Sequence, residues 1–225
     1  MIPWLAENDT LFPSIDSALT EPNGLLAVGG DLSEQRLISA YTKGIFPWFN
    51  QGEPILWWSP APRCVLYPQD LHISKSLAKC IRQQKFTVTF DQNFNDIINH
   101  CSDSRKSQEG TWITDDMKAA YNKLFKLGCA HSVEVWHDDM IVGGLYGLAF
   151  GGIFFGESMF SYQTNASKVG FCALVNKLKE EGFSLIDCQV HSPHLASLGA
   201  INITRATFLE HINDNYNKKD AWLSV

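Results

Sequence analysis

A run of 17 residues without a charged side chain, 140–156, constrains the fold more than any other feature of this 225-residue chain. Its length lies at the lower limit for a membrane-spanning helix. The run contains six glycines, however, and the adjacent pair Gly151 and Gly152 is typical of a tight turn. It therefore predicts a β-hairpin made of two buried strands rather than a membrane span.

The hairpin belongs to a mixed α/β pattern that begins near Pro60. Strands are predicted over 86–90, 131–136, 140–149, 152–159 and 184–190, and helices over 32–41, 74–84, 91–100, 114–127, 165–181 and 206–216. Asp91 and Thr114 are the expected N-caps of two of these helices. Three successive strands, a crossover helix and a further strand predict a mixed sheet with helices on it. The turn-rich residues 1–61 are predicted to form a small N-terminal domain, and residues 62–225 a larger one.

The N-terminus lacks the basic stretch of a secretory signal and carries Glu7 and Asp9. Six cysteines are scattered along the chain without a CxxC motif, which is typical of reduced, buried thiols. We therefore expect a cytoplasmic protein without a membrane partner. Gly24 to Gly30 is no phosphate loop, because no Gly-Lys-Ser/Thr follows, and no GxGxxG opens a helix after a strand.

The charge is unevenly distributed. The net charge of −6, from 18 basic and 24 acidic residues, argues against a nucleic-acid partner. Residues 63–85, however, hold five basic side chains and only one acid, Asp70. Lys75, Lys79 and Arg82 share one face of the predicted helix over 74–84. An acidic protein with this basic segment can still bind a polyanion.

Two predicted strand ends carry polar side chains suited to catalysis. Glu157 ends the uncharged run, so its carboxyl group is expected in apolar surroundings with a perturbed pKa. In the strand over 184–190, the period of two places Asp187 and Gln189 on one face and Cys188 on the other. The alternative is that these polar groups only stabilise the strand ends by hydrogen bonds, and on residue types alone it is favoured.

The spacing Cys188-x2-His191-x2-His194 is similar to that of metal ligands. No fourth ligand and no paired Cys/His half-site accompanies it, so a non-metal role is favoured. A nucleophilic pair of Cys188 and His191 lacks a third group to orient the histidine.

Several tryptophans lie in loops or beside Pro and Gly rather than at periodic core positions. Exposed tryptophans near basic residues suit the stacking of unpaired bases, at about 1–3 kcal/mol per base. The alternative is that they pack the two domains together. We expect Trp57 or Trp58 to lie at such an interface and Trp48 and Trp112 to remain free.

Short motifs follow one another along nearly the whole chain. They are EPNGLLAVGGDL (21–32), YTKGIFPWF (41–49), PILWWSP (54–60), LHIS (71–74), GTWIT (110–114), HSVEVW (131–136), VGGLYG (142–147), GESMF (156–160), NASK (165–168), LIDCQV (185–190) and ASLGA (196–200). Together they resemble the leucyl/phenylalanyl-tRNA–protein transferase family. A match in this order over this length is far more specific than any single motif.

The resemblance implies an aminoacyltransferase that moves leucine, and less readily phenylalanine or methionine, from aminoacyl-tRNA. The acceptor is the α-amino group of a protein that begins with Arg or Lys, which is thereby marked for degradation in an N-degron pathway. The implied fold is a small N-terminal domain on an acetyltransferase-like (GNAT-like) C-terminal domain with a mixed sheet. The resemblance implies neither a metal nor another cofactor, and we expect a monomer.

The resemblance also implies site residues. Asp187 would draw a proton from the acceptor ammonium, directly or through Gln189, and Glu157 would complement the acceptor's positive charge. The terminal adenosine of the tRNA would be held by Trp48, Trp112, Tyr41 and Tyr121. The donor side chain would lie in an apolar pocket of Leu145, Phe154, Met159, Phe171, Leu174 and Ile186. The tRNA phosphates would bind Arg63, Lys75, Lys79, Arg82 and Lys85.

Two other functions fit parts of the sequence. An acyl-CoA-dependent N-acetyltransferase would share the fold, but no Arg/Gln-x-x-Gly-x-Gly/Ala pyrophosphate loop precedes the predicted helix over 165–181. A non-catalytic RNA-binding module would explain the tryptophans and the basic helix. It leaves Glu157, Asp187 and Gln189 without a role.

Overall fold

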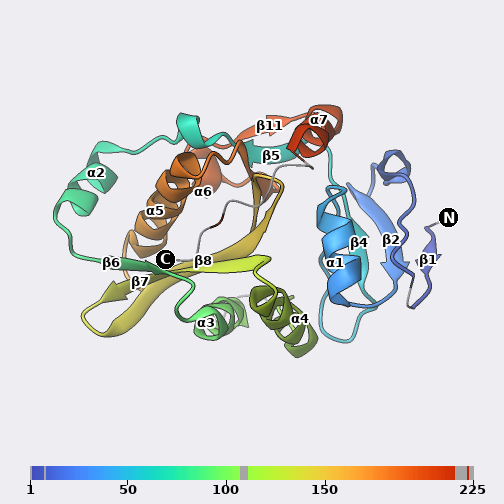
Figure 1. Ribbon diagram of the computed structural model, residues 1–225, viewed down its shortest axis with the longest axis horizontal. Helices are drawn as coiled ribbons and strands as arrows, with labels where there is room; N and C mark the ends of the chain where they lie inside the picture. The colour runs from blue at the N-terminus through green and yellow to red at the C-terminus, as the bar shows by residue number, and fades with distance from the viewer. Residues whose placement is uncertain (1, 8, 107–110, 216–221, 223–225) are drawn as a thin grey trace.

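The computed structural model describes residues 2–7, 9–106, 111–215 and 222, whose strands form two sheets (Figure 1). The smaller sheet has the order β1-β2-β4-β3, with β1 (Trp4–Leu5), β2 (Leu25–Gly29), β4 (Leu56–Trp58) and β3 (Phe46–Pro47). Helix α1 (Glu34–Tyr41) lies between this sheet and the rest of the molecule (Figure 1). The sequence predicts the helix but none of these strands, because runs this short between turns show no period.

The larger sheet has the order β11-β5-β10-β9-β8-β7-β6. Its strands are β5 (Arg63–Leu66), β6 (Thr87–Phe90), β7 (Ala130–His137), β8 (Met140–Phe150), β9 (Ile153–Ser161), β10 (Leu185–Gln189) and β11 (Ile201–Ile203). The predicted hairpin is β8–β9, which turns at Gly151 and Gly152, both at positive φ. Strand β10 runs parallel to β9 and antiparallel to β5, so the predicted mixed sheet is confirmed.

Helices cover both faces of the larger sheet (Figure 1). They are α2 (Lys75–Arg82) and α5 (Ala166–Glu180) on one face, α3 (Phe94–Lys106) and α4 (Asp115–Lys126) on the other, with α6 (Pro193–Ala196) and α7 (Arg205–Asn215) after β10 and β11. Glycine lets α5 approach closely: a Cβ on Gly143 of β8 would lie 2.8 Å from the Cβ of Ala166. No helix of the described residues is long and apolar enough to cross a bilayer.

Local signals set most helix starts. Thr114 caps α4 as predicted, accepting the N–H of Met117 at 3.2 Å. The prediction for Asp91 is wrong, because its carboxylate accepts the N–H of Ser132 at 2.8 Å instead and α3 begins only at Phe94. Helix α7 is described to Asn215, so the predicted end at Tyr216 lies outside the described residues.

The first sixty residues do not pack apart from the larger sheet. One cluster of buried side chains contains Leu37 and Ala40 of α1 together with Leu124 of α4 and Leu148 of β8. Trp57 is buried in the smaller sheet, where its Nε1–H donates to the carbonyl of Gly29 at 2.9 Å. This shared core holds α1 and β3 against the part of the larger sheet that carries the site described next.

Candidate active site

A cavity of about 340 Å³ opens where β9 and β10 separate. The two strands pair from Ile153/Leu185 to Phe155/Asp187, and beyond that point both line the cavity. Strand β3, helix α5 and the segment that contains α6 supply other parts of its wall. Segments from distant parts of the chain therefore meet at this one opening.

The apolar residues predicted to form a donor pocket all lie in the wall of this cavity. They are Leu145, Phe154, Met159, Phe171, Leu174 and Ile186. Their side chains come from β8, β9, α5 and β10 and form a continuous apolar surface. A wall of this kind suits an apolar or aromatic side chain of modest size that is not branched at Cβ.

Glu157 reaches its position through a β-bulge. Tyr146 pairs with Ser158 and Gly147 pairs with Gly156, so Glu157 is an extra residue in β9. Its Oε1 accepts hydrogen bonds from the hydroxyl of Tyr41 at 2.6 Å and from Nε2 of Gln189 at 3.1 Å. Bulges of this kind redirect side chains next to active sites.

Burial raises the pKa of Glu157 to about 8, although hydrogen bonds from Tyr41 and Tyr121 lower it. Nearby Asp187 raises it further by charge repulsion. The carboxyl group therefore keeps its proton through most of the neutral range. The perturbed pKa expected of Glu157 is found, because the site removes this group from water. That Glu157 complements the positive charge of the acceptor stays a prediction.

This shift predicts a pH-dependent stability. The folded-state pKa of about 8 lies above the ordinary value of 4.5, so the folded protein holds the proton more tightly than the unfolded chain. The resulting stabilisation is fully present below about pH 4.5 and is lost as the pH rises through about 8, at no more than about 1.4 kcal/mol per unit. Glu157→Gln cannot ionise, so its free energy of unfolding should fall less than that of the wild type between these values. Urea unfolding at several pH values measures the difference, and parallel curves for both proteins would contradict it.

Tyr41 and Tyr121 do not stack on a ligand. Both side chains are fully buried, and their hydroxyl groups bond to each other and to Glu157. The prediction that they hold adenosine is therefore wrong. A signal for this was present, because Tyr41 lies on the apolar stripe of its helix together with Leu37 and Ile38.

Trp48 and Trp112 both line the cavity. Trp48 is 47% exposed, and its position is fixed by Trp58, whose Nε1–H donates to the Trp48 carbonyl at 2.7 Å. The rings of Trp48 and Trp58 also pack at 5.8 Å. The indole ring of Trp48 is therefore exposed and fixed in position beside the cavity, which suits the stacking of a base.

Asp187 is fully buried and paired with Arg63. The carboxylate accepts Nε of Arg63 at 2.8 Å and Nη2 at 2.7 Å, a two-point contact. Its Oδ1 also accepts the backbone N–H of Gln189 at 2.9 Å. A carboxylate with these three donors is poorly placed to take a proton directly from a substrate.

Gln189 departs from regular strand geometry. Its φ is 62°, and the pairing of β10 with β5 shifts between Asp187 and Gln189. The predicted arrangement, with both side chains side by side on one face, is therefore wrong. The carboxylate of Asp187 points to Arg63, whereas the carboxamide of Gln189 points to Glu157.

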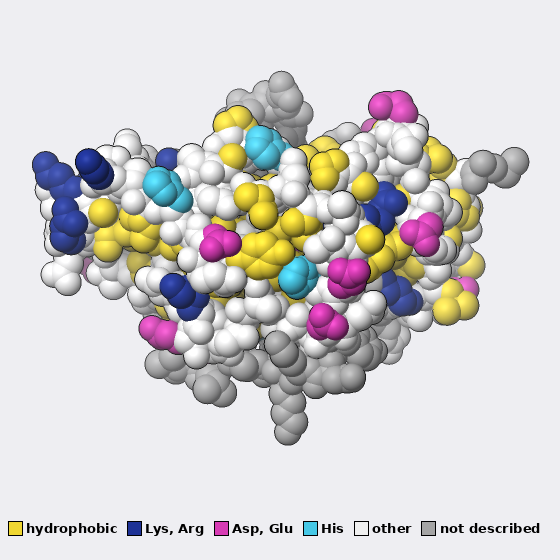
Figure 2. Space-filling view, turned by 90° about the horizontal axis from the view of Figure 1, so that it is seen from above, with side chains coloured by type: hydrophobic (Ala, Val, Ile, Leu, Met, Phe, Trp, Pro, Cys, Tyr) yellow, Lys and Arg dark blue, Asp and Glu magenta, His cyan; other side chains and the backbone are white. Residues whose placement is uncertain are grey.

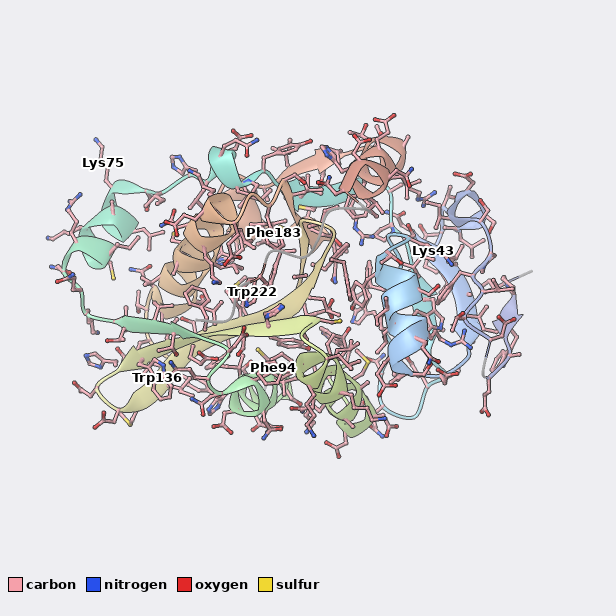
Figure 3. All side chains as sticks on the ribbon, in the orientation of Figure 1. Lys43, Lys75, Phe94, Trp136, Phe183 and Trp222 are labelled. Carbon is pink, nitrogen blue, oxygen red and sulfur yellow. The ribbon has the colours of Figure 1, made fainter. Side chains whose placement is uncertain are left out.

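The basic residues divide into two groups. Arg63 is only 1% exposed and neutralises Asp187, so the prediction that it binds phosphate is wrong. The remaining residues, which are exposed, are Lys75, Lys79, Arg82 and Lys85. Figure 2 shows Lys and Arg side chains gathered at the end of the molecule that α2 occupies, and Figure 3 shows Lys75 pointing away from the sheet.

The spacing of Cys188, His191 and His194 does not produce a metal site. Among the described residues, no three His, Cys, Asp or Glu side chains come together as ligands. His191 is exposed, whereas His194 lines the cavity. The Cys188 thiol is instead free and donates to the carbonyl of Ile186 at 3.9 Å.

Known proteins of one family match this chain over its whole length. The model of the leucyl/phenylalanyl-tRNA protein transferase family matches residues 65–213, and that of its N-terminal domain matches residues 30–61. The leucyl/phenylalanyl-tRNA–protein transferase of Ectopseudomonas mendocina is 57% identical over all of both chains. That of Pseudomonas aeruginosa strain PAO1 is 57% identical over 94% of each.

Solved structures are more distant. L-PGS from Bacillus licheniformis is 12% identical, with a TM-score of 0.43 over 84% of this chain and 64% of that one. A possible acetyltransferase from Clostridium difficile 630 is 13% identical, with a TM-score of 0.33 over 43% of this chain and 70% of that one. The sequence relatives decide the assignment, because their identity is high and extends over the full length. The chain belongs to the leucyl/phenylalanyl-tRNA protein transferase family.

Proposed function

We propose that this protein transfers leucine, and less readily phenylalanine or methionine, from aminoacyl-tRNA to the α-amino group of proteins that begin with Arg or Lys. The observation that carries the proposal is the shared cavity of the apolar wall, the two tryptophans and the Glu157–Gln189 pair. The wall suits the leucyl side chain, and the tryptophan rings suit the terminal adenine. The polar pair beside them can serve the reaction between the ester and the amine.

In this reaction the amine nitrogen bonds to the ester carbonyl carbon, the ester C–O bond breaks, and the departing ribose oxygen takes up a proton. An α-amino group has an ordinary pKa of about 7.7–8.0, so a useful fraction is neutral without a strong base. Holding the amine next to the ester carbonyl carbon can therefore supply much of the rate acceleration. Nε2 of Gln189 donates to Glu157, which leaves the carboxamide oxygen of Gln189 to accept a hydrogen bond from the amine.

The preference for an N-terminal Arg or Lys rests on family membership. Both carboxyl groups in the cavity wall, Glu157 and Asp187, are engaged within the protein. The same proposal takes the protein to be a cytoplasmic monomer, with a small N-terminal domain of residues 1–61 and an acetyltransferase-like domain of residues 62–225. It also takes the product to be marked for degradation.

A transfer assay tests this function. Purified protein should move labelled leucine from Leu-tRNA to a peptide with N-terminal Arg and leave a peptide with N-terminal Gly unmodified. The same Arg peptide with labelled acetyl-CoA should stay unlabelled, which separates the reaction from acetyl transfer. Folded protein that binds tRNA without transferring leucine would instead be an RNA-binding module, and the proposal would be abandoned.

Helix α2 and the residues just after it are proposed to bind tRNA phosphates, since Lys75, Lys79, Arg82 and Lys85 are exposed. The double variant Lys79→Ala with Arg82→Ala should bind tRNA more weakly. The slope of the logarithm of the binding constant against the logarithm of the salt concentration should become less steep by about 0.7–0.9 for each phosphate that is no longer neutralised. The kcat at saturating Leu-tRNA should not change. Lys126→Ala, an exposed lysine of α4 on the other face of the sheet, serves as the control. An unaltered salt slope in the double variant would place the tRNA elsewhere.

A further inference from the structure

Arg63 joins four parts of the fold from one buried position. Its Nε and Nη2 bind Asp187 of β10, and its Nη1 donates to the carbonyl of Gly44, between α1 and β3, at 3.2 Å. The guanidinium carbon lies 4.9 Å from the ring centre of Phe46 in β3 and 4.6 Å from that of Phe208 in α7. The side chain therefore links β10 to the N-terminal sheet and to helix α7.

Asp187 in turn contacts Gln189, which lines the cavity. Oδ1 of Asp187 accepts both Nε of Arg63 and the N–H of Gln189. Gln189 has a left-handed backbone with a φ of 62°, which is unfavourable for a residue with a side chain and persists only where the surroundings impose it. The carboxylate held by Arg63 is the group that accepts this N–H. The same backbone geometry directs the Gln189 carboxamide to Glu157, at 3.1 Å.

Stability alone does not explain the Arg63–Asp187 pair. The cost of removing two charges from water often cancels their attraction, so a buried ion pair is weak evidence for a stabilising role. Two-point guanidinium–carboxylate contact, in contrast, fixes orientation as well as distance. The geometry here fixes the one carboxylate that also accepts the N–H of Gln189.

We propose that Arg63 is a positioning residue for aminoacyl transfer. It holds the Asp187 carboxylate at two points, Asp187 fixes the backbone of Gln189, and Gln189 is thereby aimed into the cavity. Because Arg63 also packs between Phe46 and Phe208, the placement of β3 and α7 reaches the site through the same side chain. This inference rests on the proposed function, since it assigns Gln189 a part in that reaction.

Arg63→Lys tests the proposal. Lysine keeps the charge but has a single donor group, so it cannot make the two-point contact or present a planar face to both rings. We expect kcat for leucyl transfer to fall by about 10- to 100-fold, the range for loss of a group that orients a reacting one. The KM for the Arg peptide and the Kd for tRNA should change by less than about 3-fold, because no group that touches either substrate is removed. Transfer by the wild-type protein in the same assay separates a failure of this inference from a failure of the proposed function.

Arg36→Lys is the matched control. Arg36 is also fully buried, pairs with Asp31 at 3.4 Å and donates to the carbonyl of Ala6 at 2.6 Å, but it does not line the cavity. This variant should lose stability as Arg63→Lys does and keep kcat within about 2-fold of the wild type. Equal loss of kcat in both variants, or unchanged kcat in folded Arg63→Lys, would overturn the proposal.

Phe208→Leu provides a second test that leaves both charges in place. It removes the ring that lies 4.6 Å from the guanidinium, so Arg63 should be held less firmly from the side of α7. The expected fall in kcat is smaller, about 3- to 10-fold, with tRNA binding unchanged. If Arg63→Lys does not fold, wild-type kcat in Phe208→Leu would by itself overturn the proposal.

Discussion

Gln189→Ala is expected to lower kcat for leucyl transfer by about 100- to 1,000-fold, the range seen when one polar group that acts on the reacting atoms is removed. The carboxamide is the group of the cavity that the proposed mechanism leaves free to bind the amine. Stability should hardly change, because Gln189 is only half-buried and Glu157 keeps its hydrogen bonds from Tyr41 and Tyr121. Single-turnover transfer at saturating Leu-tRNA, together with a melting curve, measures both effects.

The control for this change is another half-buried glutamine. Gln163 bonds through Nε2 to Nδ1 of His137 at 3.1 Å and does not line the cavity. Gln163→Ala should keep kcat within about 2-fold of the wild type. A kcat for Gln189→Ala within about 10-fold of the wild type would remove Gln189 from a central role.

Asp187→Ala is expected to cost about 3–5 kcal/mol of the free energy of unfolding, because it leaves the buried guanidinium of Arg63 without its carboxylate. The sequence alone predicts that this variant loses leucyl transfer and still binds tRNA. The structure adds a large loss of stability, so lost activity in this variant does not by itself identify a proton acceptor. Urea unfolding measures the loss, and a value under about 1 kcal/mol would contradict the ion pair as described.

A double variant separates stability from activity. Arg63→Met with Asp187→Leu replaces both charges by apolar groups, which in buried pairs is often neutral or stabilising. It should therefore recover most of the stability lost in Asp187→Ala. Transfer should stay low, because no carboxylate accepts the N–H of Gln189. Recovery of both stability and kcat would show that the pair only supports the fold.

Patterns within short windows gave correct predictions for much of the fold. Glycines and uncharged residues in 140–156 predict the β8–β9 hairpin, and Thr114 predicts the start of α4. These features depend on neighbours a few residues away, so the sequence displays them directly. The motif match also identified the family, which the relatives at 57% identity confirm.

Most of the failed predictions concern residues whose partners are distant in the chain. Tyr41 bonds to Glu157 across 116 positions, and Arg63 to Asp187 across 124. A tyrosine beside tryptophan-rich motifs and an arginine in a basic segment were expected to bind nucleic acid, because composition cannot show which side chains are buried. The left-handed backbone of Gln189 was equally hidden, since β10 is a regular strand by its residue pattern.

The sequence by itself therefore determined the mixed α/β class and the central hairpin, and its motifs identified the family. The resemblance to that family in turn implied the six apolar residues that line the cavity. Only the tertiary structure decided the state of the polar residues. A carboxyl group is an anion, a proton carrier or a buried anchor according to the donors and the water around it, and those depend on which segments fold together. Burial raises the pKa of Glu157, whereas Asp187 pairs with Arg63, because the chain brings different partners to two neighbouring strands.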